Sequence, residues 1–153
     1  MVKLNSSTRL SSKIVVILTQ TDTTVGFLSQ NETKLQKIKS RPSSKPFIKV
    51  YKNFQALDFR TPKSKRKMLR RAVKTTFIVN NIAFRVAADK LNSQILRDSQ
   101  WNYSTSANES GKVYNRDFCE EKADIIIEDK DGLFEAKASK LLKINAKKTR
   151  RVR

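Results

Sequence analysis

Histidine is absent from this sequence, and cysteine occurs only once, at Cys119. The lack of histidine excludes Ser-His-Asp and Cys-His chemistry, histidine-ligated metals and imidazole acid–base steps. A single cysteine forms neither a disulfide framework nor a cysteine-based zinc site. Any catalysis must therefore depend on positioning and on stabilisation by cations and hydrogen bonds.

Glycine and proline are also scarce, with three of each, which excludes collagen-like and low-complexity classes. The apolar run at residues 14–18 is far too short to span a bilayer, and the N-terminus lacks a signal-peptide layout. We therefore expect a cytoplasmic protein with no membrane partner. The 153 residues fit one domain, residues 1–153, with a real hydrophobic core.

Positive charge is abundant: 33 lysines and arginines face 14 acids, a net charge of +19. Such an excess indicates a polyanionic partner, most commonly nucleic acid. Residues 60–74 carry eight cations and no acid, and Pro62 stands where a helix could begin. In that helix an apolar stripe (Met68, Leu69, Ala72, Val73) should face the core. The opposite face is either solvated or binds phosphates through Lys63, Lys65, Arg66, Lys67, Arg70 and Arg71.

Periodicity predicts a mixture of strands and helices along the chain. The capping-box spacing from Ser29 to Glu32 predicts that Ser29 caps a helix over residues 30–39. We expect Cys119 to pack as a small apolar side chain. Residues 1–13 form a short strand or a loose arm, and residues 147–153 a basic tail or an edge strand. The predicted strands are 14–19, 47–51, 75–80, 82–87, one beginning near 101, 125–127 and 141–144; further helical segments are 53–57, 89–98 and 115–122.

Three polar stretches stand at the ends of these elements: residues 21–24, 39–46 and 104–111. The second contains Lys39, Arg41 and Lys45, and its two prolines, Pro42 and Pro46, exclude a helix interior. A stiff cationic loop suits a triphosphate or a carboxylate, because guanidinium is a planar fork and ammonium a compact charge. The alternative is a basic turn in a very basic protein.

Read together, these stretches resemble the YrdC-like family, the threonylcarbamoyl-AMP synthases. The resemblance is carried by Lys39-x-Arg41 with Ser106-x-Asn108, and by four wider matches: Thr21-Asp22-Thr23-x-x-Gly26, Arg41-Pro-Ser-Ser-Lys45-Pro46, Phe84-Arg85-Val86, and Ser104-Thr-Ser-Ala-Asn-x-Ser-Gly111. It implies an α+β (mixed α/β) fold, in which helices flank a single twisted mixed sheet with a central basic cavity. It also implies synthesis of threonylcarbamoyl-adenylate and pyrophosphate from threonine, bicarbonate and ATP, with Mg²⁺ carried on the ATP. The product would be used to form threonylcarbamoyl-adenosine in tRNA. The tRNA would contact this chain either directly or through the transferase machinery.

The resemblance also implies roles for individual residues. Lys39 and Arg41 would be catalytic, with Lys39 bridging the carbamate and the α-phosphate. ATP would bind Arg41, Lys45, Asn81, Ser106, Asn108, Tyr114 and Arg153. Threonine would bind Thr23, Arg85 and Ser139, with the backbone at Val50 and Ser104.

Two other functions remain open at this point. One is a non-catalytic module on the same fold that binds tRNA or double-stranded RNA through residues 60–74 and the basic C-terminus. The other is a phosphosugar enzyme of similar fold, which would usually need grouped acidic metal ligands. The sequence shows no such group.

Overall fold

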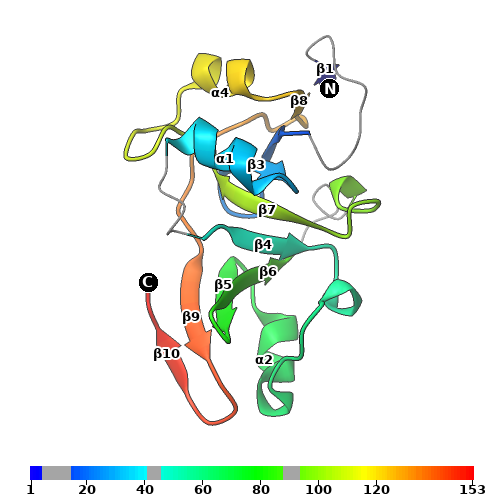
Figure 1. The fold of residues 1–153 in the computed structure, drawn as a ribbon, viewed down its shortest axis with the longest axis vertical. Helices are drawn as coiled ribbons and strands as arrows, with labels where there is room; N and C mark the ends of the chain where they lie inside the picture. The colour runs from blue at the N-terminus through cyan, green and yellow to red at the C-terminus, as the bar shows by residue number, and fades with distance from the viewer. Residues whose placement is uncertain (5–14, 41–45, 88–93) are drawn as a thin grey trace.

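A computed structural model describes residues 1–4, 15–40, 46–87 and 94–153. Its centre is one mixed sheet in the order β1-β8-β2-β3-β7-β4-β6-β5-β9-β10 (Figure 1). The strands are β1 (Val2–Leu4), β2 (Ile17–Gln20), β3 (Val25–Ser29), β4 (Ile48–Tyr51), β5 (Thr75–Val79), β6 (Ile82–Val86), β7 (Trp101–Ser106), β8 (Ile125–Ile127), β9 (Lys140–Ile144) and β10 (Thr149–Arg151). The helices are α1 (Glu32–Lys39), α2 (Arg66–Arg71) and α4 (Arg116–Lys122), with 3₁₀ turns η1 (Phe54–Ala56) and η2 (Lys63–Lys65).

The sheet confirms the expected mixed α/β class. Strands β2 and β8, β4 and β6, and β5 and β9 pair in parallel, and the other neighbours are antiparallel. The predicted hairpin β5–β6 turns at Asn80 and Asn81, whose φ angles are +49° and +64°. Asparagine tolerates this left-handed backbone, which suits the twist of a two-residue hairpin loop. The C-terminus forms an edge strand, β10, and the N-terminus a short strand, β1.

The start of α1 differs from the prediction. Ser29 is the last residue of β3, where it pairs with Tyr103, so it does not cap the helix. The cap is Asn31, whose side-chain oxygen accepts from the backbone N–H of Lys34 at 3.0 Å. Because Ser29 pairs in the sheet, the helix begins two residues later and Asn31 caps it; asparagine is an equally good capping residue.

Strand β3 was not predicted, although all five of its residues are buried. Its apolar run is short and interrupted by Gly26. That glycine is required by packing, because a Cβ atom there would lie 2.9 Å from the carbonyl oxygen of Thr105. The backbones of β3 and β7 therefore approach closely beside the polar residues that precede β3 and those that follow β7.

Two apolar clusters fill the space between the sheet and the helices. One lies under α1 and α4 and includes Phe27, Leu35 and Cys119; the other includes Tyr51 and Phe84 and packs against α2. Figure 1 shows α1 and α4 at one end of the molecule and α2 at the other. Cys119 is fully buried, as expected, and this burial raises the pKa of its thiol to about 11.

The predicted apolar stripe of the basic helix is partly wrong. Leu69 is buried, and Met68 and Ala72 pack against the second cluster, but Val73 is 67% exposed. The helix ends at Arg71, so Val73 no longer follows helical periodicity. Of the helix predicted over 89–98, residues 89–93 lie outside the described part. None of the described helices is long and apolar enough to cross a membrane.

Candidate functional site

A cavity of about 300 Å³ opens where the polar stretches meet. It is bounded by the turn before β3 and the start of that strand, by the start of β4, by the ends of β6, β7 and α1, and by the segment before β9. Among the residues predicted from the sequence, the cavity is lined by Thr23, Lys39, Arg85, Ser104, Ser106, Asn108, Ser139 and Arg153. Two further predicted residues, Arg41 and Lys45, lie outside the described part of the chain.

Strand pairing explains why distant segments converge here. Strand β3 follows the threonine-rich turn and pairs with β7, which places Gly26 opposite Ser106 and Leu28 opposite Ser104. Strand β4 separates β7 from β6 and aligns Val50 with Arg85. Helix α1 leaves β3 and returns its last residue, Lys39, to the same edge of the cavity. The sheet thus joins residues more than sixty positions apart.

Lys39 is held by the loop that contains the Ser-x-Asn motif. Its side-chain nitrogen donates to the carbonyl oxygen of Ser106 at 3.0 Å, and to the backbone and side-chain oxygens of Asn108. The hydroxyl of Ser106 donates to the same Asn108 side-chain oxygen at 2.7 Å, and the Asn108 amide donates to the carbonyl of Lys112. Lys39 is only 4% exposed, and these oxygens compensate the loss of water around its charge.

The position of Lys39 at the end of α1 adds to this stabilisation. The next residue, Ser40, has a left-handed φ of +46°, and its backbone N–H donates to the carbonyl oxygens of Gln36 and Lys37. The C-terminus of a helix carries partial negative charge, which favours a cation there. The ammonium is therefore positioned before any ligand arrives.

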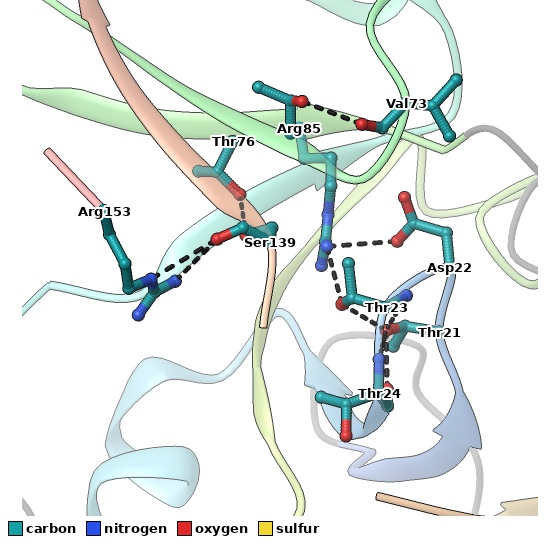
Figure 2. Close-up of polar contacts among 10 residues, drawn as sticks. Thr21, Asp22, Thr23, Thr24, Val73, Thr76, Arg85, Ser139 and Arg153 are labelled. Carbon is teal, nitrogen blue, oxygen red and sulfur yellow. Dashed lines mark hydrogen bonds and ion pairs between the residues drawn. The ribbon is translucent and has the colours of Figure 1, made fainter. Parts of the chain in front are cut away.

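A second cation, Arg85, is fixed by the threonine-rich turn (Figure 2). Its Nη1 donates to the hydroxyl of Thr23 at 2.9 Å and forms an ion pair with Asp22 at 3.1 Å. Thr21 organises the turn: its hydroxyl donates to the carbonyl of Thr24 at 2.7 Å and accepts from the N–H groups of Thr23 and Thr24. The four polar residues of this turn thus form a scaffold for a nearly buried guanidinium.

Ser139 and Arg153 complete the cavity on the side of the C-terminal strands. The hydroxyls of Ser139 and Thr76 lie 2.8 Å apart, and both residues are buried. The guanidinium of Arg153 donates to the carbonyl of Ser139 at 3.3 Å (Figure 2). Arg153 is an exposed residue. Arg153 therefore places positive charge at the mouth of the cavity, and Ser139 lies inside it.

Three predicted residues are not among those that line the cavity. Asn81 lies exposed in the β5–β6 turn. Val50 is buried in β4 between two paired strands. Tyr114 packs beside the first apolar cluster, and its hydroxyl is buried with no hydrogen-bond partner in the described part of the chain. Burial raises the pKa of that hydroxyl.

Sequence reasoning also missed several residues that line the cavity or contact its lining residues. Phe47 and Ile48 form an apolar section of the wall, and their only signal was their position directly after the basic loop. Thr76, the partner of Ser139, gave no signal beyond being one of two threonines at the start of a strand whose other residues are apolar. Asp22 stood in the threonine-rich motif without an assigned role, yet it is the ion-pair partner of Arg85.

The residues predicted to bind the phosphates of a nucleic acid lie away from this cavity. Lys63, Lys65, Arg66, Lys67, Arg70 and Arg71 belong to η2 and α2, at the end of the molecule opposite α4 (Figure 1). All of them are exposed except Lys65, which is half-buried.

Comparison with known proteins adds information about the fold. No protein-family model and no curated protein matches the sequence. Solved structures do match: P. abyssi Sua5 complexed with L-threonine superposes with a TM-score of 0.75 at 17% identity, over 91% of this chain and 50% of that one. E. coli YciO gives a TM-score of 0.73 at 19% identity, over 91% of this chain and 82% of that one. Full-length HypF in the phosphate- and nucleotide-bound form gives 0.75 at 11% identity, over 100% of this chain and 25% of that one.

These superpositions show that the chain has the YrdC-like fold that the sequence resemblance implied. The chain spans about half the length of the Sua5 structures. At these identities the similarity concerns the fold, and the chemistry has to be argued from the cavity.

Proposed function

We propose that this chain forms L-threonylcarbamoyl-adenylate and pyrophosphate from L-threonine, bicarbonate and ATP. The observation that supports the proposal most strongly is the convergence of Lys39, Arg85 and the Ser106–Asn108 loop on one cavity. The similarity of the fold to that of Sua5, which was solved with L-threonine, is consistent with it. A protein that only bound RNA would have no need to surround a small cavity with these groups.

One part of the cavity suits a small zwitterion. Arg85 offers a fixed cation that can attract a carboxylate. Around it, Thr23, Ser104 and Ser139 present hydroxyls that can hydrogen-bond an amine or a side-chain hydroxyl. In the proposal this part binds threonine.

The other part suits a nucleotide. Lys39, Ser106 and Asn108 lie together beside the end of α1, and Arg153 lies at the mouth. In the proposal these groups hold the phosphates, together with Arg41 and Lys45 of the loop that follows Lys39. Ligand contacts were also predicted for Asn81, Tyr114 and the backbone at Val50. These contacts stay predictions, because none of the three residues lines the cavity.

In the proposed reaction the side chains mainly position the substrates and offset their negative charge. The amine of threonine condenses with bicarbonate to a carbamate, with loss of water. A carbamate oxygen then attacks the α-phosphorus of ATP, the bond to the β-phosphate oxygen breaks, and pyrophosphate leaves. Lys39 lies where an ammonium can offset the negative charge shared by carbamate and α-phosphate, and such preorganised charge is a large part of phosphoryl-type catalysis.

The described residues contain no group of three or more carboxylate, thiol or imidazole side chains that could hold a metal. In the proposal, Mg²⁺ is therefore part of the substrate, bound by the triphosphate oxygens. The product would be used, in the cytoplasm, by a separate transferase that modifies tRNA.

Pyrophosphate release tests the proposal. The wild-type chain should release pyrophosphate from ATP and bicarbonate when L-threonine is present, and much less with other amino acids. Lys39→Ala should abolish release. Lys37→Ala is the matched control, because Lys37 is an exposed lysine on the same helix, and it should leave release unchanged.

The second candidate function is a non-catalytic RNA-binding module on the same fold. It is favoured by the acid-free basic surface that α2 and the C-terminal strands share. The same assay separates the two: RNA binding without threonine-dependent release at any substrate concentration would support the module and refute the enzyme.

A further inference from the structure

Charge is distributed very unevenly along this chain. Residues 59–87 and 136–153 together carry 17 of the 33 cations and none of the 14 acids. The rest of the chain has 16 cations and 14 acids, a net charge of only +2. Residues 109–135 alone contain nine acids and four cations. Almost all of the net positive charge therefore belongs to two segments.

The fold brings these two segments side by side. Strand β5 pairs in parallel with β9, with Thr75 opposite Lys140. The hydroxyl of Ser64 in η2 donates to the carbonyl of Ala146, in the turn between β9 and β10, at 2.8 Å. Figure 1 shows α2 and the β9–β10 hairpin at one end of the molecule and α4 with β8 at the other. The molecule is therefore polarised, with its basic residues gathered at one end.

The cations at this end are exposed and form what we call the basic face. Its members are Lys63, Arg66, Lys67, Arg70, Arg71, Lys74, Lys140, Lys143, Lys147, Lys148, Arg150 and Arg151. None of the ion pairs found within the described ranges involves a member of this face. So many like charges repel one another, and a polyanion would relieve that repulsion and release its own counterions.

A hollow within the basic face indicates which polyanion fits. It has a volume of about 210 Å³ and lies between η1 and α2. Phe54, Leu57 and Phe59 give it an apolar lining, and it is also lined by Arg60, Arg66 and Arg70. Planar guanidiniums stack on bases and hold phosphates in a bidentate manner, and an apolar surface receives a base that has left its stack. An acidic peptide offers carboxylates but no flat apolar ring beside each charge.

We infer that the basic face binds an RNA loop. The phosphates of the loop lie along α2 and the β9–β10 hairpin, and one unpaired base enters the hollow. The inference does not depend on the chemistry in the cavity, since the face and the hollow share no residue with the groups proposed to hold threonine or ATP.

Fluorescence anisotropy with a labelled RNA hairpin, titrated at several salt concentrations, tests the inference. The double variant Lys67→Glu/Arg71→Glu reverses two exposed charges on α2. It should weaken binding at least tenfold and make the log–log salt dependence shallower by about 1.4, at about 0.7 per lost phosphate contact. Lys122→Glu/Lys130→Glu makes the same change in net charge at the opposite end and should leave the salt slope unchanged.

Two further measurements examine the hollow. Wild-type chain should prefer the hairpin severalfold over a fully paired RNA duplex of equal charge. Arg66→Lys/Arg70→Lys retains the charge but loses the planar groups, so it should reduce that preference without changing the salt slope. Thermal melting of each variant would establish that it remains folded.

Three results would overturn the inference. The first is equal loss of binding in the two charge-reversal variants. The second is equal affinity for hairpin and duplex. The third is displacement of RNA by poly-glutamate at the same charge concentration, which would indicate an acidic protein partner instead.

Discussion

The ion pair between Asp22 and Arg85 offers a quantitative test of how the cavity is built. Its side chains are 12% and 7% exposed, and its charged atoms lie 3.1 Å apart. Two unit charges at about 4 Å attract by about 4 kcal/mol at an effective dielectric constant of about 20. Removing one partner of a buried pair typically costs about 3–5 kcal/mol, because the other charge remains buried.

Asp22→Asn removes the negative charge but keeps the size of the side chain and one acceptor oxygen. Because the Thr23 hydroxyl also still accepts from Arg85, we expect a loss at or just below the lower end of that range, about 2–3 kcal/mol of unfolding free energy. For a chain of this length the midpoint of thermal unfolding should fall by roughly 5–10 °C. Urea unfolding at neutral pH measures the loss directly.

A double-mutant cycle separates this pair from general damage to the turn. Arg85→Met removes the cation and retains an unbranched apolar side chain, so Asp22→Asn added to it should cost much less than it does alone. A coupling energy of about 1.5 kcal/mol or more is the expected result. Additive losses, or a loss below about 1 kcal/mol for Asp22→Asn alone, would refute the view that this ion pair organises the cavity.

Three further predictions concern other parts of the fold. Gly26→Ala should destabilise the chain by about 1–3 kcal/mol and impair ligand binding, because its Cβ would lie 2.9 Å from the carbonyl oxygen of Thr105; urea unfolding that is unchanged would contradict this. Burial and the hydrogen bond to Asp58 raise the pKa of Tyr51, so the contribution of this hydroxyl to stability is complete below pH 10 and is lost as the pH rises above that value. Tyr51→Phe should cost about 1 kcal/mol of unfolding free energy at pH 7 and should make the loss of stability above pH 10 smaller. Urea unfolding curves at pH 7 and above pH 10 would measure both effects. Cys119, fully buried with its pKa raised to about 11, should resist iodoacetamide at pH 8 until the chain is unfolded in urea, whereas rapid labelling of the folded chain would show that the thiol is accessible.

Local sequence signals predicted most of the helices and strands but fewer of the long-range contacts between them. The Asn80-Asn81 pair predicted a tight hairpin because asparagine tolerates positive φ, and both residues do adopt it. Ser29 misled the prediction because pairing with β7 is a long-range interaction that local capping rules do not include. Val73 misled it because the helix ended sooner than the apolar pattern suggested.

The site shows the same division. Motif order predicted that Lys39 would meet Ser106 and Asn108, and the hydrogen bonds of Lys39 to that loop are present. No sequence pattern indicated that Thr76 would contact Ser139, since that contact depends on the lateral packing of β5 beside the segment before β9. Residues 60–74 and the basic C-terminus were both predicted to bind nucleic acid, but no local pattern indicated that they lie side by side, because the C-terminal hairpin contacts η2 through tertiary structure.

Detection of the product itself tests the central claim most directly. The wild-type chain would be incubated with ATP, L-threonine and ¹³C-labelled bicarbonate, and the mixture analysed by mass spectrometry. The account predicts an adenylate that carries both threonine and one labelled carbon, and its loss in Lys39→Ala but not in Lys37→Ala. A folded wild-type chain that binds ATP and threonine yet forms no labelled adenylate would contradict it.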